Sequence, residues 1–348
     1  MNKIRNSTFY VKLTHWEYWN FYVVYAFVIL YYIYLAIKSR TLLFFTASNP
    51  GIENSGFIGE SKSEIFRKIP SEYLPPYIFI KPKETISFVL DKLKEHEISF
   101  PFIAKPDVGE RGQGISKIND LDALRYYHTH IHVPYIIQAF VDYELELGVF
   151  YYRFPNQSKG VVSSIVRKGF LSVTGDGKST LKQLIENYPR ARFRLSYLEN
   201  KFAYRINAIV PKGETIELEG IGNHSRGTTF LNANQLINDQ LRHVFDGISK
   251  QIDGFYFGRF DLRCKSIEDL CRGENIRILE LNGAGAEPAH IYQPGFSFWE
   301  GQKVLLYHWK VLYQISEINI RNGIKPLNFQ QARSEMRKHA QALKSIGI

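Results

Sequence analysis

A segment towards the C-terminal end of the chain, FGRFDLRCKSIEDLCRGENIRILELNGAGAEP (residues 257–288), concentrates acidic, amide and arginine side chains in two strand-like runs. Side chains alternate between the faces of a strand, so Arg259 and Asp261 share one face, as do Glu280 and Asn282 in the second run. If the runs pair as a hairpin, the four side chains lie together. Two carboxylates and an amide oxygen are hard ligands that suit Mg²⁺. The alternative is an ordinary solvated sheet face.

A second segment, PFIAKPDVGERGQG (residues 101–114), places Lys105 ahead of three closely spaced glycines, Gly109, Gly112 and Gly114. A lysine cation and consecutive free backbone N–H groups both stabilise phosphate oxygens, so this segment predicts a phosphate site. Its order differs from a P-loop, in which the lysine closes the glycine run, and from a protein kinase, in which the lysine lies on a later strand.

Three other matches to known motifs fail. SVTGDGKST has Ser172 where a Walker A sequence needs its first glycine, and HEISF ends in Phe100 where a zincin needs its second histidine. The H-R-D and D-F-G strings of protein kinases do not occur. The sequence therefore supports neither a P-loop, nor a zincin, nor a kinase.

Composition indicates a globular chain. With 348 residues, 45% of them hydrophobic and 22% charged, it can bury one large or two ordinary cores. The formal net charge of +10 is spread along the chain, which favours anionic ligands or an anionic lipid surface and does not specifically indicate nucleic acid. Cys264 and Cys271 fit neither a zinc knuckle nor a disulfide framework, so a reducing cytosol is the simplest location.

Beyond Pro50 the chain is a mixture of predicted strands and helices. Seven short apolar runs predict strands: YIFI, PFIAK, YIIQAF, LGVFYY, GVVSSIV, FGRFDL and IRILEL. Helical patterns occupy residues 84–97, 119–131, 180–188 and 232–253, and two further helices after Phe298 are separated by Gly323 and Pro326. We expect an α+β fold in four parts: a hydrophobic membrane-associated segment (1–45), a lead-in (46–100), a main domain (101–297) and a C-terminal helical extension (298–348).

The N-terminal segment WNFYVVYAFVILYYIYLAI (residues 19–37) carries no charge. As a helix it would reach about 28 Å, close to the hydrocarbon thickness of a bilayer, and tyrosines flank its centre as in an aromatic belt. We expect membrane attachment through a transmembrane helix, a helix in the interface, or a hairpin continued by TLLFF (residues 41–45). A buried aromatic core helix is the alternative.

Together, the lysine before a glycine loop, the intervening QAFVDYELELGVFYY and the late acidic pair resemble the ATP-grasp superfamily in the order that family keeps, over residues 58–297. The GRFD…LELN hairpin resembles that of D-alanyl-D-alanine ligase. VTGDGKSTLKQLI and GNHSRGTTF are similar to segments of cyanophycin synthetase. The resemblance implies two α+β subdomains that clamp ATP, here between an N-terminal hydrophobic helix and a C-terminal helical extension.

The resemblance also implies roles for individual residues. Lys105 contacts the α- and β-phosphates, the glycine loop closes over the β- and γ-phosphates, Gln138 and the backbone after it hold adenine, and Glu146 accepts from the ribose hydroxyls. An earlier nucleotide-contacting lysine is Lys62, with Lys68 as the alternative. The nucleotide-binding residues are then Lys62, Lys105, Gly109, Arg111, Gly112, Gln113, Gly114, Gln138, Phe140, Val141 and Glu146.

In the acidic hairpin, the resemblance makes Asp261, Glu280 and Asn282 the metal ligands. Arg259 becomes the catalytic residue that stabilises charge on the transferring phosphoryl group. His224 and Arg226 in GNHSRGTTF reach phosphate or a substrate carboxylate, or else lie on the surface; Arg167 and Lys168 pose the same choice.

The implied activity is an ATP-dependent ligase that uses Mg²⁺, or Mn²⁺ in its place, and joins a small carboxylate to an amine or a thiol through an acyl phosphate. The alternatives are an ATP-grasp phosphotransferase and a non-catalytic ATP-binding protein at the membrane. No complete α/β domain precedes the grasp segment, so the acceptor substrate cannot be read. The hydrophobic segment would favour a membrane-proximal substrate, with the catalytic domain in the cytoplasm.

Overall fold

The computed structural model describes residues 16–110, 112–220 and 227–347. Within them, a four-stranded antiparallel sheet has the order β1-β4-β2-β3. Its strands are β1 (Tyr77–Ile80), β2 (Phe102–Pro106), β3 (Ser116–Ile118) and β4 (Tyr135–Ala139), and the helices packed on it are α6 (Ile86–Glu95) and α7 (Leu121–His130). Thr85 and Asp120 cap these helices by accepting from backbone N–H groups of the first turn. The glycine loop connects strands β2 and β3 of this sheet.

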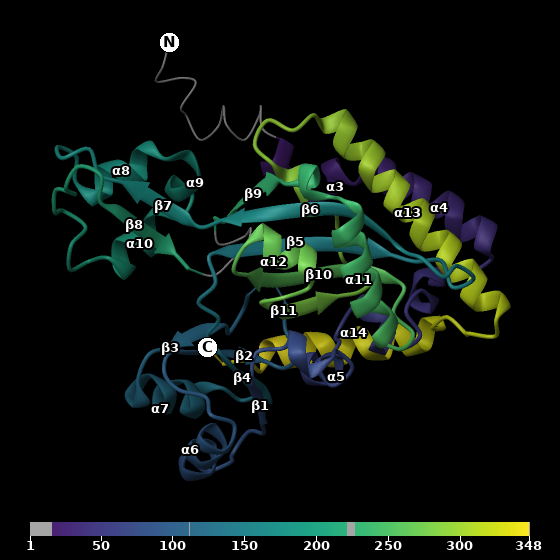
Figure 1. The fold of residues 1–348 in the computed structure, drawn as a ribbon, viewed down its shortest axis with the longest axis horizontal. Coiled ribbons are helices and arrows are strands. Elements are labelled where there is room, and N and C mark those ends of the chain that lie inside the picture. The colour runs from purple at the N-terminus through teal and green to yellow at the C-terminus, as the bar shows by residue number, and fades with distance from the viewer. Residues whose placement is uncertain (1–15, 111, 221–226, 348) are drawn as a thin grey trace.

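A five-stranded antiparallel sheet, of order β11-β10-β5-β6-β9, forms the centre of the molecule (Figure 1). Its strands are β5 (Leu145–Tyr152), β6 (Val161–Gly169), β9 (Thr229–Asn232), β10 (Phe257–Cys264) and β11 (Ile276–Asn282). One face packs against α11 (Asp239–Gln251) and α12 (Ile267–Arg272), and the other against α13 (Phe298–Arg321). Alternation along β10 sends Phe260 to the α11 side and Phe257 to the α13 side, so Arg259 and Asp261 share the α13-side face.

A third, small lobe projects from one end of the central sheet (Figure 1). It pairs β7 (Leu171–Thr174) with β8 (Thr215–Glu219) and adds α8 (Leu181–Asn187), α9 (Pro189–Arg192) and α10 (Leu195–Lys201) around its own core. The near-Walker string lies here as a turn before α8: Asp176 accepts from the backbone N–H groups of Lys178 and Ser179. An aspartate that occupies these N–H groups explains the glycine-rich turn without a phosphate.

The expectation of a transmembrane helix over residues 19–37 is wrong. The segment divides at Tyr25 into α3 (Phe21–Val24) and α4 (Ala26–Ser39), which lie along α13. Val28 and Leu35 are buried on the inner side of α4. Among the described residues no helix has the length and apolarity needed to cross a membrane.

The TLLFF run likewise does not continue a membrane hairpin. Phe44 and Phe45 begin a short 3₁₀ helix, η2 (Phe44–Ala47), and are buried against α13, where Phe44 meets Tyr313 edge-on at 5.6 Å between ring centroids. The two predicted C-terminal helices are confirmed as α13 and α14 (Phe329–Lys344). After α14 the chain reaches the glycine loop, because Ile346 is fully buried within 4 Å of the Cβ positions that Gly109 and Gly114 would carry.

Candidate functional site

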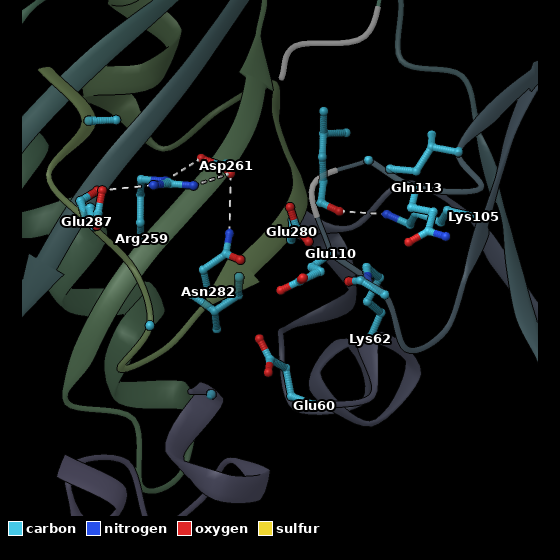
Figure 2. A pocket seen from close by; sticks show the side chains of 18 of the residues that line it. Glu60, Lys62, Lys105, Glu110, Gln113, Arg259, Asp261, Glu280, Asn282 and Glu287 are labelled. Carbon is cyan, nitrogen blue, oxygen red and sulfur yellow. Dashed lines mark hydrogen bonds and ion pairs between the residues drawn. The ribbon is translucent and has the colours of Figure 1, made fainter. Parts of the chain in front are cut away.

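A cavity of about 760 Å³ lies between the four-stranded and five-stranded sheets. Ligand pockets in proteins measure roughly 300–1,000 Å³, so this one can hold a large ligand or two smaller ones. Its lining includes Lys105 from β2, Gln138 from β4, and Asp261 and Glu280 from the central hairpin. Figure 2 shows Lys62 and Lys105 on one side of this space, with Arg259 and Asp261 on the other.

The acidic hairpin forms as the alternation predicts. Arg259 pairs with Asn282 and Asp261 with Glu280 across β10 and β11, so all four side chains lie on one sheet face. The register then shifts after Asp261, which leaves Leu279 as an extra residue in β11. A bulge frees backbone groups from the ladder, and here the Leu279 carbonyl accepts from Lys105 Nζ at 2.9 Å. The bulge thus joins the two sheets at the cavity.

Asp261 is a buried carboxylate of the cavity that faces two cations. Arg259 binds it through two hydrogen bonds, Nε to Oδ1 at 2.8 Å and Nη2 to Oδ2 at 3.0 Å, and Lys168 Nζ lies 3.7 Å from Oδ2. Burial opposes ionisation of Asp261, but the charges of Arg259 and Lys168 outweigh it and hold its pKa below the usual value. Asp261 is therefore ionised at neutral pH.

The hairpin offers a donor set that fits a hard cation. Asn282 Nδ2 lies 3.3 Å from Asp261 Oδ2, and Glu280 stands opposite Asp261 across the strand pair. No group of three or more His, Cys, Asp or Glu side chains within the described ranges is arranged to hold a metal ion. Mg²⁺ commonly uses only one or two carboxylates and takes its other ligands from water and substrate phosphates. Asp261 and Glu280, with Asn282 beside them, meet that smaller requirement.

Lys105 is the buried cation on the opposite side of the cavity. Its Nζ donates to Gln138 Oε1 at 2.9 Å as well as to Leu279, and it lies 5.0 Å from the centre of the Phe66 ring. Desolvation dominates and lowers the pKa of Lys105 to about 8, although the Glu280 charge acts in the opposite direction. The Nε2 group of Gln138 is buried with no hydrogen-bond partner in the described structure, so this group can donate to a ligand beside Lys105.

Of the two candidate lysines of the lead-in, Lys62 faces the cavity. It begins α5 (Lys62–Phe66), is buried, and donates from Nζ to the Gly109 carbonyl at 2.9 Å. Lys68 is exposed and does not line the cavity. The chain thereby brings Lys62 to the glycine loop from 47 residues away in sequence.

Two residues of the glycine loop have a backbone conformation that favours glycine. Gly112 and Gly114 have φ angles of +76° and +69°, in the left-handed region that favours glycine. Gly109, Gly112 and Gln113 line the cavity, whereas Gly114 packs against Pro106 and Ile346 outside the lining. Arg111 lies outside the described residues.

The predicted adenine and ribose residues occupy the same cavity. Phe140 and Val141 line it after β4, together with Glu146. The Glu146 carboxylate already forms ion pairs with Arg263 at 2.9 Å and Lys168 at 3.2 Å. A ribose hydroxyl would therefore share Glu146 with two cations, and this role stays a prediction.

Two cavity cations were not assigned from the sequence. Lys168 lines the cavity from β6, whereas Arg167 does not. The sequence alone left both residues with the same two alternatives, a site residue or a surface residue. Arg263 lines it from β10 and donates to the Val141 carbonyl at 2.7 Å. The alternation along β10 predicts its place on the same strand face as Arg259 and Asp261, and only its contact with Val141 was missed.

Acidic residues were missed as well: Glu60, before α5, and Glu287, after β11, both line the cavity. Burial is the main cause that raises the pKa of Glu60, and Glu280 adds to it. The predicted substrate residues His224 and Arg226 lie outside the described residues, so their placement is untested.

No protein-family model matches the chain, and no curated protein matches it. Solved structures do. D-alanine–D-alanine ligase from Bacillus anthracis is 16% identical, with a TM-score of 0.41, over 75% of this chain and 67% of that one. VanG D-Ala:D-Ser ligase from Enterococcus faecalis is 12% identical, with a TM-score of 0.42, over 73% of this chain and 61% of that one.

The chain is similar to D-alanine ligases. A bifunctional glutathione synthetase from Pasteurella multocida also matches, at 13% identity and a TM-score of 0.38, with 70% of this chain covered but only 35% of that one. The chain thus spans about one third to two thirds of these proteins. At such identities and TM-scores, the similarities assign no role to a residue.

Proposed function

We propose that this protein is an ATP-dependent ligase of the ATP-grasp type that joins a carboxylate to an amine. The observation that carries the proposal is the arrangement across one cavity. Two buried lysines and a glycine loop face a hairpin whose arginine, two carboxylates and amide share one sheet face. Cations suit the phosphates of a nucleotide, and carboxylates suit the metal that accompanies them.

The nucleotide would lie across the cavity from Gln138 to the hairpin. Lys105 and Lys62 would contact phosphate oxygens, since their present partners are mainly neutral carbonyl groups that anionic phosphates can replace. The unpaired Nε2 donor of Gln138 supports a ring nitrogen of the base as its partner. Phe140 and Val141 supply the apolar surface for the base.

The hairpin would hold Mg²⁺ through Asp261 and Glu280, with Asn282 as a third oxygen donor, and Mn²⁺ would suit the same ligands. When bound, such an ion neutralises phosphate charge and orients the phosphates. Arg259 is held by two hydrogen bonds to Asp261 and places a permanent positive charge at the same sheet face. We propose that Arg259 stabilises the negative charge that develops on the transferring phosphoryl group.

The reaction has two displacements. A carboxylate oxygen of the first substrate attacks the γ-phosphorus of ATP, the bond from that phosphorus to the β,γ-bridging oxygen breaks, and ADP leaves. The amine nitrogen of the second substrate then attacks the acyl carbon, the bond to the phosphate oxygen breaks, and inorganic phosphate leaves together with a proton from nitrogen. A thiol in place of the amine would give a thioester by the same steps.

A screen that measures ADP release from MgATP with pairs of small carboxylates and amines tests this proposal. A ligase releases ADP and phosphate in equal amounts and requires both substrates. Phosphate that stays on a product identifies the phosphotransferase alternative. ATP binding without turnover, for every pair tested, would contradict an enzymatic function.

A further inference from the structure

The cavity continues past Arg259, away from Lys105, into an end formed mainly by aromatic side chains. We call this end the aromatic arm; it comprises Trp16, Trp19, Phe21, Tyr25 and Tyr292. The Trp16 and Tyr292 rings lie 5.6 Å apart, and Phe21 stacks on Tyr25 at 4.3 Å. Four of these five side chains come from the hydrophobic segment that the sequence assigned to the membrane.

Glu287 lies beside Arg259 (Figure 2) and contacts the aromatic arm through Tyr292. Its Oε2 accepts from the Tyr292 hydroxyl at 2.7 Å, and its main-chain carbonyl accepts from Arg259 Nη1 at 3.1 Å. Its carboxylate forms no ion pair within the described part of the chain, whereas Asp261 and Glu146 each face two cations. Burial raises the pKa of Glu287, and the hydrogen bond from Tyr292 offsets this only in part. A cationic ligand would supply that compensation.

Glu17 adds a second carboxylate to the same end. It follows Trp16 in the short helix η1 (Trp16–Tyr18), lines the cavity, and has a buried Oε1 atom with no hydrogen-bond partner among the residues described. Aromatic rings and carboxylates together favour organic cations, since ring faces and anionic oxygens both attract an ammonium group. A carboxylate group on the same ligand would be repelled by Glu17 and Glu287.

We propose that the aromatic arm binds the amine substrate, and that this substrate is a primary amine with an apolar aromatic or alkyl group. The proposal rests on the ligase function above. Glu287 accepts from the ammonium group beside Arg259, and the rings of the arm enclose the apolar group. Transfer of one ammonium proton to the Glu287 carboxylate frees the nitrogen lone pair that attacks the acyl carbon.

The test measures binding by tryptophan fluorescence in the full chain, loaded with Mg²⁺ and a non-hydrolysable ATP analogue. The probes are 2-phenylethylamine, ethylamine without the ring, and 2-phenylethanol without the charge. We expect 2-phenylethylamine to bind at least tenfold more tightly than either control. Equal affinities for the three probes would overturn the proposal, whereas failure of the ATP analogue to bind would overturn the ligase function instead.

Two variants assign the contacts. Glu287→Gln should weaken 2-phenylethylamine about tenfold or more and leave 2-phenylethanol unchanged, while Phe21→Ala should weaken both. Glu300→Gln, at an exposed position of α13, removes the same charge without touching the arm and should change neither. Affinity for the ATP analogue should be the same in all three variants. An amine affinity that does not respond to Glu287→Gln places the ammonium elsewhere and refutes the assignment.

An independent observation concerns the outer side of α3 and α4. Apolar and aromatic side chains are exposed along its length: Tyr22 by 73%, Phe27 by 45%, Leu30 by 66%, Ile33 by 45%, Tyr34 by 56% and Ile37 by 73%. We call these six residues the outer face. Singly exposed apolar residues are ordinary, but a contiguous row on two successive helices marks an interaction surface.

We propose that the outer face docks on an anionic lipid bilayer without crossing it. Lys38 and Arg40 are exposed at its end, and Lys310 is exposed on the adjacent α13, so cations border the apolar row. Tyrosines within the row suit the headgroup level of a bilayer, and an apolar helix face with basic flanks is typical of helices that lie in the interface. Phe21, which lines the aromatic arm, is 56% exposed beside this face, so docking places the arm at the lipid surface.

Co-sedimentation of the full chain with vesicles tests this docking. We expect binding to phosphatidylcholine vesicles with about 30% phosphatidylglycerol, weaker binding to phosphatidylcholine alone, and loss of both in the double variant Leu30→Glu/Ile37→Glu. Met336→Glu on α14, at an apolar position that is 57% exposed, is the control and should bind as wild type does. Absence of vesicle binding, or a dimer in solution that the double variant dissociates, would overturn the bilayer as the partner.

Discussion

Glu280 and Asp261 face each other across the hairpin, yet the structure predicts different consequences when each is neutralised. Glu280 is half-buried and forms no ion pair among the described residues, so Glu280→Gln should change the free energy of unfolding by no more than about 0.5 kcal/mol. Asp261 holds Arg259 and lies near Lys168. Asp261→Asn leaves two buried cations short of a partner and should cost about 3 kcal/mol of stability.

Both substitutions should slow ATP turnover, because each removes one anionic oxygen from the proposed metal site. A loss of about 2.7 kcal/mol of transition-state stabilisation corresponds to about 100-fold in rate. The effects should be strongly non-additive: the double variant should lose far less than the roughly 10⁴-fold product of the singles, since both carboxylates act on one ion.

The assay is steady-state ADP release at saturating ATP over a Mg²⁺ titration, paired with thermal unfolding of each variant. We expect Glu280→Gln to unfold as wild type does and to need more Mg²⁺ for its residual activity. A Glu280→Gln variant that folds normally and keeps wild-type, Mg²⁺-dependent turnover would refute the metal site and, with it, the ligase assignment.

Three further predictions follow from the geometry of the site. ATP affinity should be flat below pH 8 and fall above it, since phosphate binds the charged form of Lys105, whose pKa is about 8. Lys105→Met should abolish this pH dependence. Constant ATP affinity up to pH 9.5 in calorimetry would contradict the prediction. Lys62→Met should weaken ATP binding at least tenfold while Lys68→Met leaves it unchanged, and equal effects in the same assay would remove Lys62 from the site. Gly148→Ala puts a Cβ atom 2.8 Å from Val166 Cγ1, 3.0 Å from Asp261 Oδ1 and 3.2 Å from Arg259 Cδ, so the Asp261–Arg259 pair must shift. Turnover should fall at unchanged ATP affinity, and unaffected turnover would contradict a need for this pair in its present position.

The acidic hairpin was predictable because local rules govern it. Side chains alternate between the two faces of any strand, whatever surrounds it. Asp261 and Glu280 therefore lie on one face once β10 and β11 pair as a hairpin. Lys105 and residues of the glycine loop line one cavity, as expected from their closeness in the sequence, and their contact with phosphate stays a prediction. The bulge at Leu279 was not predictable, because a one-residue shift depends on the packing of the whole sheet.

The N-terminal segment shows where local rules fail. Its apolar residues cover all sides of a helix, a pattern shared by membrane spans and by helices packed on a protein core. Packing against α13 decides between them, and the break at Tyr25 carries no proline or glycine signal. The salt bridges of Lys168 to Glu146 and Asp261 were unpredictable for another reason, since they join three different strands. The roles of His224, Arg226 and Arg111 remain predictions.

The measurement that tests the proposed function most directly is the product balance in the presence of a substrate carboxylate and hydroxylamine. Hydroxylamine intercepts an acyl phosphate as a hydroxamate, and chromatography of the nucleotides shows which phosphate bond of ATP was broken. The proposed function predicts one hydroxamate for each ADP, dependence on Mg²⁺, and loss of both products in Glu280→Gln. Hydroxamate accompanied by AMP and pyrophosphate, or ADP formed without hydroxamate, would contradict it.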